Sequence, residues 1–264
     1  MGWKTGYVQV RDVRLHYWRR GSGRPLVLAH GYGDSGECWT RVAEALDDTY
    51  DIVAYDARYH GLSDAPEAGE MQRSTMGDDL AGVVEALGLQ RPAIMGHSMG
   101  AMTVMFAAAA RPEQFRCAIM EDPPFWIGDP PQRPPTVPEA RTAEELETMG
   151  RAQSPTWHES EFAPWARSKL QLRMPTRGRG GLPGFDVWRT EVAKMDLPTL
   201  LVCGGNRDRM AIVSDEVAAS VQAINPQVQV VKFASAGHNV RREVYDGFVA
   251  AVRSFLDLDA GAGS

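Results

Sequence analysis

Cysteine is scarce in this sequence of 264 residues, which contains only Cys38, Cys117 and Cys203. The three lie far apart and in no metal-ligand spacing, and an odd number does not suit a fold held together by disulfide bonds. These features argue against a disulfide-stapled extracellular fold. We therefore expect three free thiols.

Long apolar runs and an excess of basic residues are also missing. No segment approaches the roughly 18 apolar residues of a membrane helix, and the first residues contain no continuous apolar stretch typical of a signal peptide. The 28 Lys and Arg are outnumbered by 34 Asp and Glu, for a net charge of -6. No basic surface for a nucleic-acid backbone is expected. The sequence predicts a soluble cytoplasmic protein that binds neither membranes nor nucleic acid.

Short apolar segments alternate with helix-like segments along most of the chain. Residues 7–19 predict a hairpin, and later buried strands are expected at 25–29, 51–55, 92–95, 117–120, 197–202 and 228–233. Helices are expected near 36–47, 74–87, 98–110, 214–223 and 240–256. Such alternation is typical of βαβ units. The predicted fold class is α/β, with a mostly parallel central sheet flanked by helices.

The alternation stops between residues 123 and 194. This block holds eleven of the 17 prolines and four of the seven tryptophans, with helical pieces expected near 139–150 and 159–171. We interpret it as a cap (lid) of 123–194 inserted into a core formed by 1–122 and 195–264. Its large rings suit a pocket for a hydrophobic or aromatic substrate, although they could equally pack the cap onto the core. The candidate substrate-binding residues are Trp126, Trp157, Trp165 and Trp188.

The segment Gly96-His97-Ser98-Met99-Gly100 joins the apolar strand at 92–95 to a helix. In this context the G-x-S-x-G pattern indicates a nucleophile elbow, a sharp turn that exposes Ser98 at the end of the strand. Serine is also a common helix N-cap, so the pattern alone leaves that alternative open. The amides of Met99 and of Tyr32, which follows an earlier strand, are expected to form an oxyanion hole.

A serine nucleophile needs a general base, and histidine is the usual choice because its pKa lies near neutrality. Of the six histidines, only His238, in Ala236-Gly237-His238-Asn239, follows a predicted strand late in the chain. We therefore assign His238 as the base. His30 and His97 are expected to support the oxyanion loop and the elbow.

Two carboxylates are placed to orient this histidine. Asp122 follows the strand at 117–120, and Asp208 follows the strand at 197–202. Both positions lie at the carboxyl edge of a parallel sheet, where such sites form. Their positions in the sequence do not decide which of the two carboxylates orients the histidine.

These motifs together resemble the α/β-hydrolase superfamily, in the subtype with a cap between core strands six and seven. The resemblance rests on His30-Gly31, Asp56-Ala-Arg-Tyr-His-Gly-Leu-Ser63, Gly96-His-Ser-Met-Gly100 and Ala236-Gly-His238. It implies that the acid follows strand seven, as in most members, or strand six, as in fungal zearalenone lactonases and haloalkane dehalogenases.

The two candidate acids differ in how well they match the superfamily. The loop before Asp208 is one residue longer than the usual pattern, whereas two prolines after Asp122 would hold its backbone rigid. We favour Asp122, with Asp208 as the alternative acid and Glu121 third.

The resemblance implies a serine nucleophile, and we predict a serine hydrolase that cleaves a carboxylic ester or lactone of a small hydrophobic or aromatic substrate through an acyl-enzyme on Ser98, with no metal or cofactor. A serine nucleophile disfavours epoxide hydrolase and dehalogenase mechanisms, which need an aspartate ester. Two alternatives stay open: a cofactor-free lyase or carbon–carbon bond hydrolase with the same triad, and a non-catalytic protein that binds a small ligand. The fold does not identify the substrate.

Overall fold

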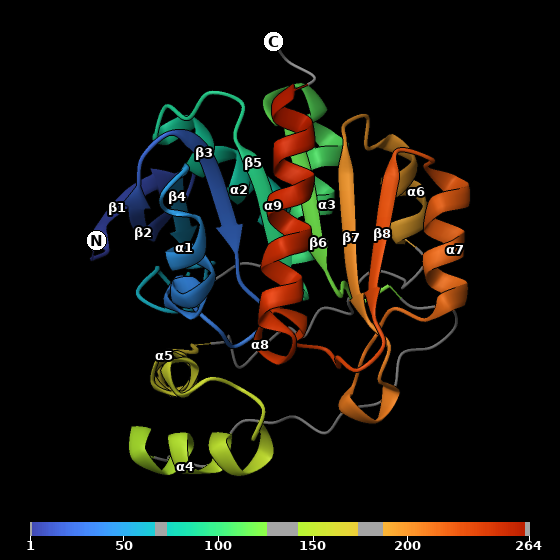
Figure 1. Ribbon diagram of the computed structural model, residues 1–264. Coiled ribbons are helices and arrows are strands. Elements are labelled where there is room, and N and C mark those ends of the chain that lie inside the picture. Colours follow the sequence, from blue (N-terminus) through green and yellow to red (C-terminus); the bar gives the residue numbers. More distant parts are fainter. Residues whose placement is uncertain (1, 67–72, 126–141, 174–186, 262–264) are drawn as a thin grey trace.

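A computed structural model describes residues 2–66, 73–125, 142–173 and 187–261. A single eight-stranded sheet crosses the molecule in the order β1-β2-β4-β3-β5-β6-β7-β8 (Figure 1). The strands are β1 (Lys4–Val10), β2 (Val13–Gly21), β3 (Arg24–Ala29), β4 (Tyr50–Tyr55), β5 (Ala93–His97), β6 (Cys117–Glu121), β7 (Thr199–Gly204) and β8 (Val228–Phe233).

The sheet is mostly parallel, as the sequence predicts. β1 and β2 form the expected hairpin, and β2 also pairs antiparallel with β4, while every other pairing is parallel. Strands β5, β6 and β7 are buried along their whole length, which explains why their sequences are continuous apolar runs. Because they are parallel, their carboxyl ends meet at one edge.

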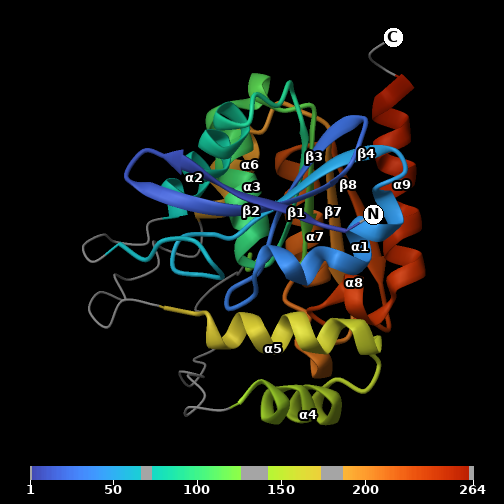
Figure 2. The ribbon, with the colours of Figure 1, turned by 90° about the vertical axis from the view of Figure 1, so that its left-hand side faces the viewer.

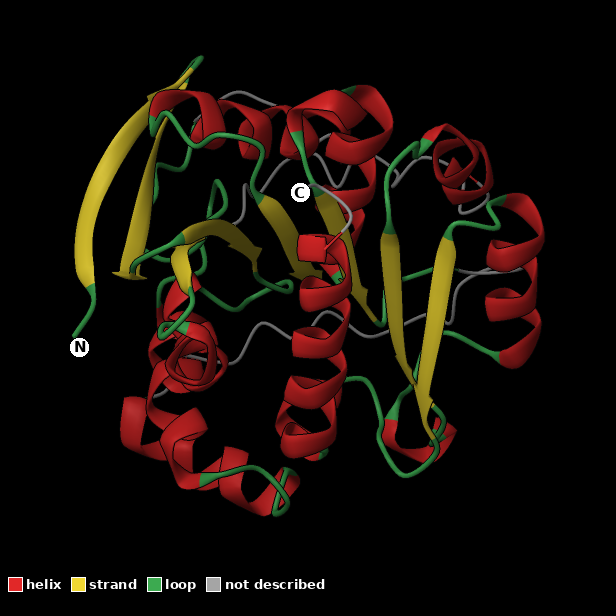
Figure 3. Ribbon diagram, turned by 45° about the horizontal axis from the view of Figure 1, so that its top comes forward, coloured by secondary structure: helices red, strands yellow, loops and turns green. Residues whose placement is uncertain are grey.

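Helices cover both faces of the sheet and bury an apolar cluster on each (Figures 1 and 3). One face is covered by α2 (Arg73–Ala86), α3 (Met99–Ala110), α6 (Val187–Lys194) and α7 (Asp215–Ile224). The other is covered by α1 (Thr40–Leu46) and α9 (Tyr245–Gly261). The α/β prediction is confirmed.

Two further helices, α4 (Ala143–Gln153) and α5 (Phe162–Leu170), lie beyond the carboxyl ends of the strands (Figures 1 and 2). They pack against each other, and α4 begins with a capping box between Thr142 and Glu145. We call residues 142–170 the α4–α5 unit. Helix α6 lies in the same stretch of sequence but packs against α3 and α7. The segment expected as a cap therefore also supplies a helix to the core layer.

The last predicted helix is divided in two. α8 (Val240–Glu243) is followed by Val244, whose φ of -133° and ψ of 52° are not helical, and α9 begins at the next residue. The Glu243 side chain bends back to accept hydrogen bonds from the amides of Gly237 and Asn239. The break thus comes directly after Glu243, the residue whose side chain holds the backbone on either side of His238.

The three cysteines are free and buried. None of the helices in the described ranges is both long and apolar enough to cross a membrane.

Candidate active site

The turn between β5 and α3 presents Ser98 in a strained conformation. Its φ of 51° and ψ of -112° are rarely adopted by a residue with a side chain, and such strain is typical of functional sites. A Cβ at Gly96 would lie 2.2 Å from the carbonyl oxygen of Gly100, and one at Gly100 would lie 2.0 Å from that of Ala29. Only glycine fits at both places, so this sequence can make the tight elbow that the G-x-S-x-G pattern predicts.

His238 and Asp122 come together at the carboxyl edge. The distance from His238 Nδ1 to Asp122 Oδ2 is 2.6 Å, and the amides of Ile212 and Val213 donate to the same carboxylate at 2.9 and 3.1 Å. Asp122 is fully buried. Since an ionised carboxylate only accepts, this contact assigns the proton to Nδ1 of His238 and leaves Nε2 as the acceptor.

The other two candidate acids lie elsewhere. Asp208 is exposed in the short 3-10 turn Arg207–Arg209. Glu121 is buried, which raises the pKa of its carboxyl, and it pairs with Arg241 at 3.1 Å. The structure thus brings Asp122 to the histidine, while Asp208 and Glu121 have other surroundings.

The elbow is joined to His238 through His97. His97 Nε2 donates to the carbonyl oxygen of His238 at 3.0 Å, and the two ring centroids are 4.7 Å apart. Burial holds the pKa of His97 well below its usual value, so the ring is neutral. Within the described residues, Ser98 and His238 share no direct hydrogen bond. Such contacts often tighten only when substrate is bound.

The loop expected to supply one oxyanion-hole amide is the turn from Gly31 to Asp34. The amide of Asp34 donates to the carbonyl oxygen of Gly31 at 3.0 Å, and His30 Nδ1 donates to the same oxygen at 2.8 Å. Burial lowers the pKa of His30, and its Nε2 accepts from the Ala57 amide at 2.9 Å. As expected from the sequence, His30 supports this loop.

The two amides expected to form an oxyanion hole have no partner in the described part of the chain. Neither the Tyr32 nor the Met99 amide donates a hydrogen bond to another group of the protein there. The Tyr32 side chain is 52% exposed. Free amide donors are what acyl-transfer chemistry requires of an oxyanion hole.

The fold and these motifs agree with a match of residues 24–240 to the model of the alpha/beta hydrolase fold family. The chain belongs to this family. N-formylmaleamate deformylase from Pseudomonas putida is 28% identical over 264 residues, which cover 96% of each chain. The crystal structure of the N-formylmaleamic acid deformylase from Pseudomonas putida S16 superposes with a TM-score of 0.78 at 26% identity, covering 95% of this chain and 100% of that one.

An enol-lactonase from Burkholderia xenovorans LB400 has a TM-score of 0.71 at 21% identity and covers 96% of this chain and 100% of its own. That likeness shows the fold alone. The matches support the assignment of this α/β-hydrolase family member as a hydrolase.

Sequence reasoning missed Glu243 in this α/β hydrolase. Its carboxylate accepts from the amides on either side of His238, at 2.9 Å from Gly237 and 3.3 Å from Asn239, and pairs with Arg209 at 3.1 Å. The side chain is 6% exposed. A charged run directly after the histidine, Arg241-Arg242-Glu243, is the signal that could have shown it.

A buried group of charges next to the site was also missed. Asp34 Oδ2 lies 3.2 Å from Arg241 and 3.1 Å from Arg242, and its Oδ1 lies 2.8 Å from Lys169 Nζ. Burial alone would raise the pKa of Asp34, but Arg242, Lys169 and Arg241 hold it well below its usual value. Arg242 also pairs with Glu161 at 3.0 Å. Lys169 and Glu161 belong to the α4–α5 unit, so these charges connect that unit to the core.

The tryptophans expected in a substrate pocket have different surroundings. Trp157 stacks on Phe162 at 6.0 Å and meets Trp165 edge-on at 6.3 Å, within the α4–α5 unit. Trp188 on α6 is 1% exposed and stacks on Phe125 at 5.0 Å, so it packs the core. Trp126 lies outside the described residues.

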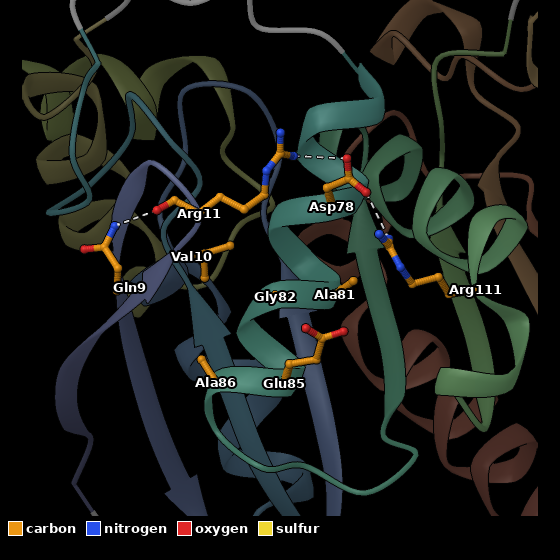
Figure 4. Close-up of a pocket in the computed structure, with 9 residues that line it drawn as sticks. All are labelled: Gln9, Val10, Arg11, Asp78, Ala81, Gly82, Glu85, Ala86 and Arg111. Atoms are coloured by element: carbon orange, nitrogen blue, oxygen red, sulfur yellow. Dashed lines mark hydrogen bonds and ion pairs between the residues drawn. The ribbon is translucent and has the colours of Figure 1, made fainter.

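A surface groove of about 500 Å³ between β1 and α2 contains no residue of this site. Figure 4 shows Asp78 between Arg11 and Arg111, with ion pairs of 3.1 and 2.9 Å. Asp78 thus has both arginines as partners, and the residues that line the groove offer no nucleophile. Over the ranges that the structure describes, no group of His, Cys, Asp or Glu could hold a metal ion.

Proposed function

We propose that this chain is a serine hydrolase that cleaves the acyl bond of a small substrate through an acyl-enzyme on Ser98, using His238 as general base and Asp122 as its orienting acid. The observation that carries the proposal is the 2.6 Å contact between Asp122 Oδ2 and His238 Nδ1 at the edge where the strained elbow presents Ser98.

In the first half-reaction Ser98 Oγ attacks the acyl carbon and His238 Nε2 takes its proton. Asp122 stabilises the imidazolium that forms, because its carboxylate accepts from Nδ1. Negative charge develops on the former carbonyl oxygen, which the amides of Tyr32 and Met99 would bind. His238 then gives the proton to the leaving group.

In the second half-reaction a water molecule attacks the acyl-enzyme. His238 takes its proton as general base, the same amides bind the second oxyanion, and Ser98 leaves with the proton returned by His238. None of these steps requires a group beyond the side chains and amides named.

Two bond types are candidates. A carboxylic ester or lactone is the expectation from the sequence. An N-acyl bond is the second candidate, since the relative that matches nearly the whole chain is a deformylase acting on N-formylmaleamate. The same triad serves either bond, because the tetrahedral intermediate differs only in the atom that leaves.

The test is a panel of p-nitrophenyl esters, five- and six-membered lactones and N-formyl amides, assayed with wild type and Ser98→Ala. We expect turnover of at least one class, reduced by about 10⁴-fold or more in the variant. Turnover of a β-diketone or cyanohydrin alone would favour a carbon–carbon hydrolase or lyase instead. Absence of Ser98-dependent turnover across the panel would refute the proposal.

A further inference from the structure

Lys169 reaches from α5 to the loop that carries the Tyr32 amide. Its Nζ donates to the carbonyl oxygen of Gly33 at 2.7 Å and to Asp34 Oδ1 at 2.8 Å. On its other side, Nζ lies 5.2 Å from the centroid of the Trp165 ring, and the side chain is 18% exposed. The ammonium group is therefore held in one place between the α4–α5 unit and the core.

The contacted loop is a tight turn. The amide of Asp34 closes it on the carbonyl oxygen of Gly31, and Gly33 has a left-handed φ of 73°. Lys169 binds the far end of this turn, while the Tyr32 amide lies in its middle. The Gly33 carbonyl shares a peptide plane with the Asp34 amide, and that amide binds the carbonyl oxygen of Gly31, which shares a peptide plane with the Tyr32 N–H. A donor fixed on the Gly33 carbonyl therefore also limits the direction of the Tyr32 N–H.

We propose that Lys169 is a positioning residue for the reaction: it holds the Gly31–Asp34 turn so that the Tyr32 amide points to the place where the oxyanion forms. The inference rests on the proposed function, in which that amide stabilises the oxyanion of the Ser98 intermediate. Donors in such a site are effective because they need no rearrangement when charge develops. The α4–α5 unit thus completes the site as well as covering it.

A second cation on α5, Arg167, makes it possible to separate the positioning role of Lys169 from simple attachment of the helix to the core. Arg167 donates to the Glu37 carboxylate at 2.6 and 3.1 Å and is 47% exposed. Like Lys169 it ties α5 to the segment after β3, but its bonds are to a side chain beyond the turn. Arg167→Met is therefore a matched control for Lys169→Met.

The first measurement compares kcat and KM for p-nitrophenyl butyrate. Lys169→Met removes the donors but keeps the length of the side chain, and Asp34 keeps Arg241 and Arg242 as partners, so we expect the fold to survive. We expect kcat to fall about tenfold with KM within about twofold, the pattern of an interaction made in the transition state. Lys169→Arg should recover most of the loss, and Arg167→Met should keep the wild-type kcat.

The second measurement replaces the carbonyl oxygen of the same ester by sulfur. Sulfur accepts hydrogen bonds weakly, so a well-aimed amide favours the oxygen ester over the thiono ester. The ratio of the two kcat values should fall about tenfold in Lys169→Met and stay unchanged in Arg167→Met. A folded Lys169→Met protein with the wild-type ratio would overturn the inference.

Amide hydrogen exchange across residues 31–34 requires no turnover. Exchange should quicken in Lys169→Met and remain as in wild type in Arg167→Met, and equal protection in the two variants would contradict the positioning role. Failure of the proposed function would be seen separately, as turnover that persists in the Ser98→Ala variant. If turnover depends on Ser98 while neither the amide exchange of residues 31–34 nor the oxygen-to-sulfur ratio of kcat values changes in Lys169→Met, only the positioning role is wrong.

Discussion

The sheet core and the α4–α5 unit are held in place by different forces. Strands β5 and β6, which are followed directly by the proposed Ser98 and Asp122, and their neighbour β7 are buried along their whole length among apolar side chains. The α4–α5 unit has a small aromatic group of its own, in which Phe162 is buried but Trp157 and Trp165 are only half-buried, and charged pairs connect it to the core. The core thus provides rigid geometry, and the unit is attached at a few points that can be removed one at a time.

This difference matters for the proposed reaction. Apolar packing is spread over many contacts, so the strand ends stay in place when any one side chain changes. A charged pair is local, and its strength depends on how far it is removed from water. Variants can therefore separate what the core does from what the attachment does.

The largest expected effect lies in the core, at Asp122. Asp122→Asn should lower kcat by about 10⁴-fold, because an amide in place of the carboxylate disturbs the tautomer of His238 and no longer stabilises its charged form. Asparagine tolerates the positive φ of 40° at this position, so the fold should be retained. Steady-state kinetics on the fastest substrate of the panel measures the effect.

Asp208→Asn is the matched control for that experiment and should change kcat by less than about twofold, as is usual for an exposed side chain away from the reacting groups. A large loss in Asp208→Asn together with a small one in Asp122→Asn would reverse the assignment of the acid.

The core was largely predictable from the sequence because its signals are local. An apolar strand followed by Gly96-His-Ser-Met-Gly100 indicates an elbow without knowledge of any distant residue, and the structure has a strained turn there. The choice between Asp122 and Asp208 could not be made in this way. It depends on the path of the chain after β7, where Met210 has a left-handed φ of 66° and the amides of Ile212 and Val213 reach Asp122.

The attachment of the α4–α5 unit could not be predicted, because its partners are distant in sequence. Arg242 and Asp34 are 208 residues apart, and Lys169 and Asp34 are 135 apart. No periodic pattern relates such positions, and charged side chains are normally expected on the surface. The divided last helix was missed for a related reason, since its break accompanies side-chain bonds from Glu243 that helical periodicity does not reveal.

The buried attachment gives the second largest expected effect. Arg242→Met would leave Glu161 buried without its cation, and removing one partner of a buried pair typically costs about 3–5 kcal/mol. We expect the free energy of unfolding to fall by that amount in urea titrations. If the variant is as stable as wild type, the charges do not hold the α4–α5 unit in the way that we infer.

A smaller effect is expected from a buried histidine of the core. Burial, together with nearby His30, lowers the pKa of His60 to about 3. Below its ordinary pKa of about 6.5 the unfolded chain binds a proton there that the folded chain does not, so His60 costs stability as pH falls from about 6.5 toward 3.

Replacing this histidine should make stability less sensitive to acid. In His60→Asn, whose amide can still donate to the Arg58 carbonyl, the slope of unfolding free energy against pH should be smaller by up to about 1.4 kcal/mol per pH unit between pH 6 and 4. Urea titrations at several pH values measure the slope. An unchanged slope would mean that His60 takes up its proton in the folded protein.

The smallest effect is expected at the exposed attachment. Arg167 and Glu37 form a pair of short contacts, but the arginine side chain is 47% exposed, and such pairs contribute only about 0–1 kcal/mol because water and salt screen them. Arg167→Met should therefore change the free energy of unfolding by less than about 1 kcal/mol, and raising the salt concentration should shrink even that difference. Comparison of the unfolding free energies of Arg167→Met and Arg242→Met tests whether burial of a charged pair determines how strongly it holds the α4–α5 unit. A loss as large as that of Arg242→Met would show that both pairs hold the unit equally, whatever their exposure to water.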